Sequence, residues 1–207
     1  MHNFYIPLTA FNIDLARIKY ELAKYVRPKS GSYAITTSKE LANDPEYDFT
    51  QFRGITHTNA NGVREFETGE QDTDLIFYPL ALQGSYLQEV EQSITSYLGL
   101  SSPRIRISKF IGGTSVHKNV YLDFHTDPHT PYRVHIALDV MPNVYWKFKT
   151  GEQEYKIHQP ADGVPVLIEV AATAHAVDIP IGHHRYHIWF QYHTPVSNEI
   201  LNRLLNN

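Results

Sequence analysis

The stretch that decides the fold covers residues 123–140, which read DFHTDPHTPYRVHIALDV. From Arg133 to Val140, polar and apolar side chains alternate, which is the pattern of a β-strand with one face on a core. Residues 173–193 read TAHAVDIPIGHHRYHIWFQYH and alternate in the same way from Arg185 to Tyr192. Both stretches therefore predict strands that carry one polar face and one apolar face.

Further strand signals lie on either side of the first stretch. Arg104 to Phe110 alternates, and Val164 to Val170 reads as a more buried strand that follows a turn. Short strands separated by turns predict a sandwich, a jelly roll or a barrel. We therefore expect a fold that is mainly β.

Helical signals lie outside these strands. Apolar residues recur at three- and four-residue steps from Asp14 to Val26 and from Ser85 to Leu98, where Ser85 and Gln88 have the spacing of a capping box. A short amphipathic helix is expected at the end of the chain. We interpret the sequence as a single domain over 1–207, with a helical flank and substrate-loop region at 1–103, the strand core at 104–193 and a C-terminal helix at 197–207.

The region 44–75 mixes Asn, Asp, Gly and Thr with aromatic side chains in no clear period. Long loops of this kind often bind ligands. The pattern allows two interpretations, a substrate-recognition loop that includes Arg53 or a plain surface loop held by its aromatic residues.

The composition is that of a globular protein, with 207 residues, a formal net charge of −4, 42% hydrophobic residues and 19% charged residues. The chain has no cysteine, which excludes disulfide scaffolds, zinc ribbons and thiol enzymes. The start lacks a signal-peptide pattern and no apolar run approaches the roughly 20 residues of a membrane helix, so we expect a cytoplasmic protein without a membrane partner. No block of Lys and Arg provides an electrostatic footprint for nucleic acid.

Ten of the 12 histidines lie between His117 and His193, which places a candidate site in the strand half. His125 and Asp127 are two residues apart, and on an extended segment they point to the same side. His175 supplies a second imidazole about fifty residues later, and Arg185 follows it by ten residues. Two imidazoles and one carboxylate with open positions are the ligand set of non-haem Fe(II) oxygenases.

Other histidines compete for the position of the distal ligand. These are His183, His184, His187 and His193. Of the candidates, His175 leaves an arginine at the right distance, on the next strand, where a planar guanidinium can hold a carboxylate with two hydrogen bonds. Arg104 and Arg106 alternate along a predicted strand, and two interpretations are open: they form part of a substrate pocket, or they lie on an exposed strand face. We favour the exposed face.

His125-x-Asp127, His175 and Arg185 at these spacings resemble the 2-oxoglutarate-dependent Fe(II) dioxygenases, whose fold is a double-stranded β-helix of the jelly-roll, cupin-like kind. Residues 132–136 and 175–187 look more specifically like the aspartyl/asparaginyl β-hydroxylase-like branch, which includes free-proline hydroxylases. The resemblance covers roughly residues 104–193.

The resemblance implies a cofactor set and a reaction. Fe(II) would be held by His125, Asp127 and His175, with 2-oxoglutarate anchored by Arg185 and His135 and with O2 as the second cosubstrate. The product would be a hydroxylated amino acid or a hydroxylated aspartyl, asparaginyl or prolyl residue of a peptide or protein. The candidates for substrate contacts are Arg133, Arg53 and Trp189.

Two residues narrow the class. Asp127 completes the ligand set, which argues against a related halogenase that needs the vacated position for halide. Nucleic-acid demethylases of the wider superfamily have a second arginine six residues after the first, where this chain has Gln191, so no nucleic-acid partner is expected. The alternatives are a cupin-like metal-binding protein or isomerase that does not use 2-oxoglutarate, and a non-enzymatic β-sandwich interaction module.

Overall fold

The computed structural model describes residues 3–26, 31–49, 56–58, 64–66, 72–112 and 124–206. In chain order the elements are β1 (Tyr5–Pro7), α1 (Leu15–Leu22), β2 (Gly31–Ala34), β3 (Thr56–Thr58), β4 (Arg64–Phe66), α2 (Tyr86–Leu98), β5 (Arg104–Ile111), β6 (Tyr132–Val140), β7 (Tyr145–Thr150), β8 (Gln153–Ile157), β9 (Val166–Glu169), β10 (Ala174–Asp178), β11 (His184–Tyr192) and α3 (Asn198–Leu205). Single turns of 3-10 helix lie at Leu41–Asn43, Asp72–Asp74 and Leu80–Leu82.

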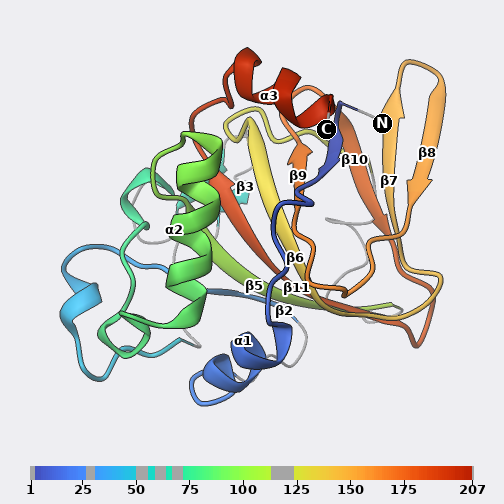
Figure 1. Cartoon of the computed structure of the whole chain (residues 1–207). Helices are drawn as coiled ribbons and strands as arrows, with labels where there is room; N and C mark the ends of the chain where they lie inside the picture. The colour runs from blue at the N-terminus through green and yellow to red at the C-terminus, as the bar shows by residue number, and fades with distance from the viewer. Residues whose placement is uncertain are drawn as a thin grey trace.

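Antiparallel pairing builds two sheets that pack face to face (Figure 1). The major sheet has the strand order β1-β9-β6-β11-β5-β2, and the minor sheet has the order β10-β7-β8. A β-bridge between His125 and His175 places the segment around His125 beside β10, at the edge of the minor sheet.

From β5 onward the chain passes repeatedly between the two sheets. The sequence of positions is major for β5, minor for the His125 segment, major for β6, minor for β7 and β8, major for β9, minor for β10 and major for β11. This alternation is a double-stranded β-helix. It confirms the predicted fold class, a mainly β jelly roll with flanking helices.

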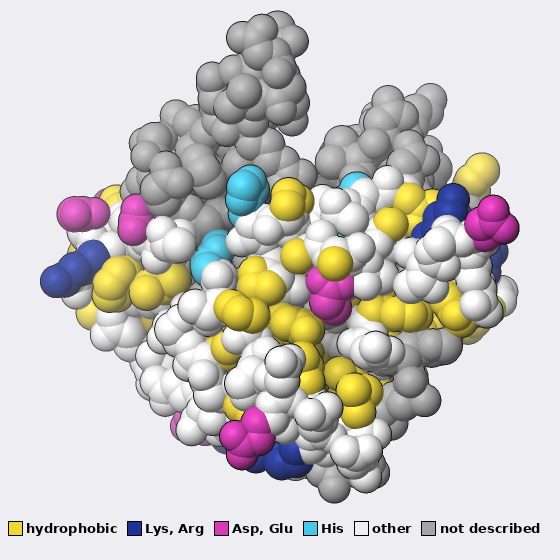
Figure 2. Space-filling model, turned by 90° about the horizontal axis from the view of Figure 1, so that it is seen from above, with side chains coloured by type: hydrophobic (Ala, Val, Ile, Leu, Met, Phe, Trp, Pro, Cys, Tyr) yellow, Lys and Arg dark blue, Asp and Glu magenta, His cyan; other side chains and the backbone are white. Residues whose placement is uncertain are grey.

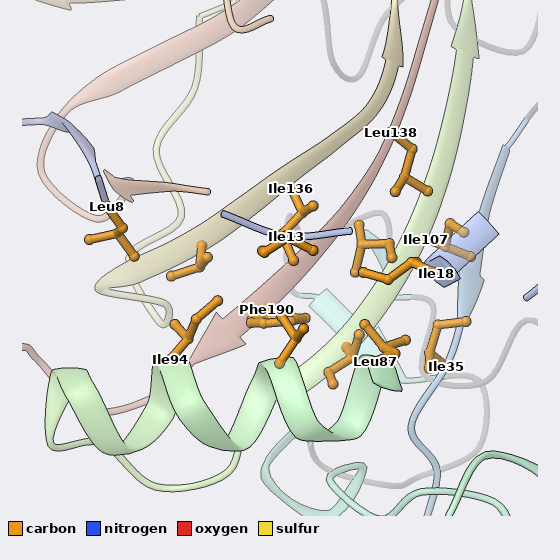
Figure 3. Close-up of a cluster of buried hydrophobic side chains, with 14 of the residues drawn as sticks. Leu8, Ile13, Ile18, Ile35, Leu87, Ile94, Ile107, Ile136, Leu138 and Phe190 are labelled. Carbon is orange, nitrogen blue, oxygen red and sulfur yellow. The ribbon is translucent and has the colours of Figure 1, made fainter. Parts of the chain in front are cut away.

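The helices cover the outer face of the major sheet (Figure 1). Leu87 and Ile94 of α2 point toward Ile136 and Phe190 of the sheet, and all four side chains are buried (Figure 3). Burying one such side chain contributes about 1.5–3 kcal/mol, so the apolar stripe of α2 and the apolar faces of the strands hold this layer together.

Both ends of α2 form as the sequence predicts. The Ser85 side chain accepts a hydrogen bond from the Gln88 backbone N–H at 3.3 Å, and the Gln88 side chain accepts one from the Gly84 backbone N–H at 2.7 Å. Gly99 ends the helix with φ of 63°, a left-handed conformation that glycine adopts without a steric penalty. The helix therefore begins and ends on local signals.

A second apolar cluster lies between the two sheets. Trp146 and Phe148 of β7 and Val177 of β10 meet Val166 and Ile168 of β9 there. The inner face of the major sheet is therefore apolar at β9, while β6, β11 and β5 place polar side chains on it.

The N-terminal half, which was predicted to be a helical flank, also contributes strands to the major sheet. β1 pairs with β9 and β2 pairs with β5, so two N-terminal segments extend the major sheet. Three- and four-residue strands are too short for alternation to be detected. The helix predicted from Asp14 to Val26 is also shorter, since α1 ends at Leu22. In the described part of the chain, no helix has the length and apolarity needed to cross a membrane.

A bulge breaks the alternation predicted for the end of β6. Tyr186 pairs with Asp139 but His187 pairs with Ala137, so the pairing skips one residue. Asp139 therefore does not lie on the face that carries Arg133 and His135. Its Oδ2 lies 2.8 Å from His184 Nε2. Arg133, His135 and Ala137 keep the alternation.

Candidate metal centre

The backbone brings the two histidines of the predicted triad side by side. The His125 N–H donates to the His175 carbonyl at 3.0 Å, and the His175 N–H donates to the His125 carbonyl at 2.9 Å. The Asp127 N–H donates to the Val170 carbonyl at 2.8 Å, which fixes the third residue against the end of β9. Two segments far apart in the sequence, 125–127 and 170–175, therefore converge at the edge of the minor sheet.

One ligand atom from each of His125, Asp127 and His175 lies within 4.8 Å of the other two. Asp127 Oδ2 is 3.4 Å from His175 Nε2 and 3.9 Å from His125 Nε2. Ligand atoms at about 2.0–2.2 Å from one ion lie up to about 4 Å apart, so small side-chain adjustments bring these three around a common ion. Among the described residues, this is the group of His, Cys, Asp and Glu side chains that can hold a metal.

The orientation of His175 suits a ligand. Its Nδ1 lies 3.2 Å from the Thr173 carbonyl oxygen. Because a carbonyl oxygen only accepts, Nδ1 carries a proton, and Nε2 on the side of Asp127 is the nitrogen that could bind a metal. The competing candidates His183, His184, His187 and His193 do not join this group.

Asp127 is buried and ionised. Burial alone would raise the pKa of its carboxyl group, but the Arg133 guanidinium, with NH1 2.8 Å from Oδ2, and the imidazoles of His175 and His125 lower the pKa below its usual range. The carboxylate is therefore available to a cation at neutral pH. Arg133, which was named as a candidate for substrate contacts, lies beside a candidate metal ligand.

A buried guanidinium lies on the inner face of the major sheet, on β11. Arg185 is 2% exposed, and its guanidinium carbon is 3.8 Å from the centre of the Trp146 ring. Its NH2 group donates to Gln159 Oε1 at 3.3 Å, whereas NH1 has no hydrogen-bond partner among the described residues. Burial lowers the pKa of Arg185 to about 9, which leaves it charged at neutral pH. A buried charge of this kind needs an anionic partner, and no described carboxylate contacts it.

His135 lies near both the triad and Arg185. Its side chain is buried, its ring centre is 4.7 Å from that of Trp146, and neither ring nitrogen has a hydrogen-bond partner in the described part of the chain. Burial, followed by the positive charges of the neighbouring residues, lowers the pKa of His135 well below its usual value. A neutral imidazole keeps one donor and one acceptor, so His135 can donate one hydrogen bond to a carboxylate.

The sequence analysis missed Gln159, which joins three of these residues. Its Oε1 accepts from Trp146 Nε1 at 3.1 Å as well as from Arg185, and its Nε2 donates to the His135 carbonyl at 3.0 Å. Gln159 lies in the connection after β8, where no period or motif marks it. The sequence carries no signal from which this role could be found.

Trp189 and the arginines around it form a second polar region. Trp189 is buried and donates from Nε1 to Ser108 Oγ at 2.9 Å. The guanidinium carbons of Arg133 and Arg106 lie 4.4 Å and 5.3 Å from the centre of its ring. The favoured interpretation of Arg104 and Arg106 as a plain exposed face is wrong, because Arg104 is 1% exposed and both alternate onto the inner face of a central strand.

The region 44–75 was predicted to be a loop, and the structure describes it at 44–49, 56–58, 64–66 and 72–75. It contains the two-stranded sheet of β3 and β4 and a turn of 3-10 helix at Asp72–Asp74, so the prediction that it lacks regular structure is wrong. Phe49 is buried, and its ring centre is 4.9 Å from that of Tyr47, so these aromatic residues pack onto the core. Arg53 lies outside the described residues.

Seen from above, histidine side chains reach the surface near the middle of the molecule (Figure 2). The described Lys and Arg side chains visible on this face lie singly near its outline (Figure 2). The arginines of the site therefore do not form a basic surface patch there, and Arg104 and Arg185 lie in the interior.

No protein-family model and no curated protein matches this chain. Among solved structures, a prolyl-4-hydroxylase from Pseudomonas putida is similar at 15% identity and a TM-score of 0.38 over 53% of this chain, and this chain covers 63% of that protein. An oxidoreductase of the 2OG-Fe(II) oxygenase family from Burkholderia pseudomallei is similar at 15% identity and a TM-score of 0.47, over 89% of this chain and 79% of that chain. The protein IDO from Bacillus thuringiensis is similar at 10% identity and a TM-score of 0.47, over 86% and 81%.

Proposed function

We propose that this chain is a 2-oxoglutarate- and Fe(II)-dependent dioxygenase that hydroxylates an amino acid or an aspartyl, asparaginyl or prolyl residue. The observation that carries the proposal is the pairing of two features on either side of Trp146: a His-Asp-His group, and a buried guanidinium whose NH1 has no partner among the described residues. A metal-binding protein or isomerase needs the first feature but gives no reason for the second.

The residues fit both ligands. Two imidazoles and one carboxylate leave coordination positions of an Fe(II) ion open. Arg185 and His135 offer a cationic fork and a neutral donor to a dicarboxylate. When bound, the iron couples the oxidative decarboxylation of 2-oxoglutarate by O2 to the insertion of one oxygen atom into a substrate C–H bond, with succinate and CO2 as the other products.

The protein's own residues would orient and shield these ligands. Arg185 would pair with one carboxylate of 2-oxoglutarate. The Trp146 ring packs against the Arg185 guanidinium, and Gln159 orients it through a hydrogen bond. Arg133 keeps Asp127 ionised, and Thr173 fixes the tautomer of His175. The apolar cluster between the sheets excludes water from one side of the site.

The first test is binding under nitrogen. Addition of 2-oxoglutarate to the Fe(II)-loaded protein is expected to produce a weak visible metal-to-ligand charge-transfer absorption. Arg185→Gln should weaken 2-oxoglutarate at least about tenfold, because a charge-assisted double hydrogen bond is lost, and should weaken Fe(II) much less. Isothermal titration of each ligand measures both affinities.

A matched control is Arg203→Gln. Arg203 also stacks on an aromatic ring, with its guanidinium carbon 4.7 Å from the centre of Tyr97, but it lies on α3 away from the site. The control should bind both ligands as the wild type does. Absence of the absorption in the wild type, or equal loss of iron and 2-oxoglutarate in Arg185→Gln, contradicts the proposal; metal binding without 2-oxoglutarate binding would favour the cupin-like alternative.

A further inference from the structure

One oxygen atom of the candidate metal centre also faces an arginine. Asp127 Oδ2 lies 3.4 Å from His175 Nε2 and 3.9 Å from His125 Nε2, so it is the carboxylate oxygen that would bind a metal together with these nitrogens. The same oxygen lies 2.8 Å from NH1 of Arg133. A guanidinium and a divalent ion would therefore share one carboxylate oxygen.

The positive charge of Arg133 is held in this place from two sides. Its guanidinium carbon lies 4.4 Å from the centre of the Trp189 ring, and its NH1 contacts the Asp127 carboxylate. The side chains of Arg133 and Asp127 are 15% and 6% exposed, so little water lies between their charges. Coulomb interactions at such a place are much stronger than between exposed groups.

The charges of this group do not balance once a divalent ion is bound. Without a metal, the positive charge of Arg133 compensates the negative charge of Asp127. A divalent ion adds two positive charges to this pair, whereas imidazole ligands bind as neutral groups and add none. Because like charges a few ångströms apart repel each other strongly in a poorly hydrated site, the metal has to bind against the guanidinium.

We infer that Arg133 is the counter-ion of Asp127 in the metal-free protein and competes with a divalent cation for Oδ2, so that it lowers the affinity of the centre for metal. The inference rests on the metal centre of the proposed function but does not depend on 2-oxoglutarate. It also fixes a sign. A residue that positions Asp127 for the metal strengthens metal binding, whereas a competing cation weakens it.

The test is calorimetric titration of Mn(II) into metal-free protein under nitrogen, without 2-oxoglutarate. Arg133→Gln should bind Mn(II) at least about tenfold more tightly than the wild type, because a competing positive charge is removed. Arg133→Lys keeps the charge and should stay within about threefold of the wild type.

A matched control is Arg106→Gln. Arg106 packs against the same Trp189 ring, with its guanidinium carbon 5.3 Å from the ring centre, so the control removes an equal charge from the same polar region. It approaches the ring from β5, on the other side of β11 from β6 and Arg133. This control should change the Mn(II) affinity by less than about threefold.

Thermal melts give a second readout, which also covers a variant that folds poorly. In the metal-free state Arg133→Gln leaves the Asp127 carboxylate without this counter-ion, so its melting temperature should fall below that of the wild type. Mn(II) should then raise the melting temperature more in Arg133→Gln than in the wild type. If the variant is unfolded without metal, Mn(II) should restore a cooperative melt.

The outcomes separate this inference from the proposed function. Weaker or equal Mn(II) binding in Arg133→Gln, or failure of Mn(II) to restore its melt, would overturn the inference. A gain in Arg133→Lys or Arg106→Gln equal to that in Arg133→Gln would overturn it as well, because the effect would not come from a charge at Oδ2. If neither the wild type nor Arg133→Gln binds Mn(II), the metal centre and the proposed function are wrong. If Mn(II) binds as expected but 2-oxoglutarate gives no charge-transfer absorption with Fe(II), the proposed function is wrong and the inference stands.

Discussion

Gln159 is an uncharged partner of a buried arginine, in a position where a carboxylate would normally be expected. Its amide oxygen accepts one hydrogen bond from the Arg185 guanidinium and so orients it, but it leaves the positive charge of that guanidinium uncompensated. A neutral acceptor therefore orients the arginine and keeps it available to an anionic ligand.

The substitution Gln159→Glu tests this role. The new carboxylate would pair with Arg185, and the affinity for 2-oxoglutarate should fall at least about tenfold, while the thermal stability stays equal or rises because a buried charge gains a partner. Calorimetric titration of 2-oxoglutarate and a thermal melt measure the two quantities. Gln153→Glu makes the same change of charge at an exposed site on β8 and should alter neither. Unchanged 2-oxoglutarate affinity in Gln159→Glu would show that Arg185 is not the anchor.

At the residue scale, the sequence was informative where chemistry and spacing coincide. His125 and Asp127 share a side because they are two residues apart, and the structure brings them to His175. Arg106 was misjudged because alternation shows which residues share a face but does not show whether that face is covered. Gln159 carried no local signal, because its role comes from strands that meet around it.

At the scale of the elements, α2 contains an acidic residue on its buried side. Glu91 is 3% exposed, and it accepts a hydrogen bond from Thr95 Oγ1 at 2.8 Å. Tyr192 OH lies 2.9 Å from the same Thr95 oxygen, so the cluster links α2 to the end of β11. Burial raises the pKa of Glu91 above its ordinary value, and the hydrogen bond from Thr95 only partly opposes this shift.

This cluster predicts how stability depends on pH. Because the folded-state pKa of Glu91 is above the unfolded one, its contribution is fully present below about pH 4.5 and is lost as the pH rises through the folded-state pKa. Glu91→Gln should therefore raise the free energy of unfolding at pH 7 relative to the wild type and remove this part of its decline with pH. Urea unfolding at several pH values measures the effect.

Glu152→Gln removes an equal charge from an exposed turn and is the control. If the free energy of unfolding changes with pH in the same way in the wild type and in Glu91→Gln, the pKa of Glu91 does not differ between the folded and unfolded states.

Elements were predictable in proportion to their length. The thirteen residues of α2 and the nine of β11 each display several periods, and their bounds agree with the pattern to within about a residue. β1 and β2 have three and four residues and owe their conformation to the strands beside them. The bulge in β6 is likewise set by its partner β11, so no property of β6 alone marks it.

At the scale of the whole molecule, the sequence pattern left sandwich, jelly roll and barrel open, and the resemblance favoured the jelly roll. The pairings that decide between them join distant segments, such as β1 with β9 and His125 with His175. Alternation specifies faces but not partners, which is why strand order could not be derived from the residues alone.

The distant origin of the ligands predicts how metal affects stability. An unfolded chain separates His175 from His125 and Asp127, so a divalent ion binds the folded state and stabilises it by about 2.7 kcal/mol at one hundred times its dissociation constant. Thermal melts with and without Mn(II) under nitrogen should show the increase in the wild type and its loss in His175→Ala. His129→Ala removes an exposed histidine two residues from Asp127 and should keep the increase. An equal increase in His175→Ala would place the ion elsewhere.

The bridge between His125 and His175 joins residues that are separated along the chain by several crossings between the sheets. Arg185 lies on β11, the last strand of the chain. The candidate metal centre therefore depends on the complete topology of the strand core. Loss of any of the crossings between the sheets would separate His175 from His125 and Asp127.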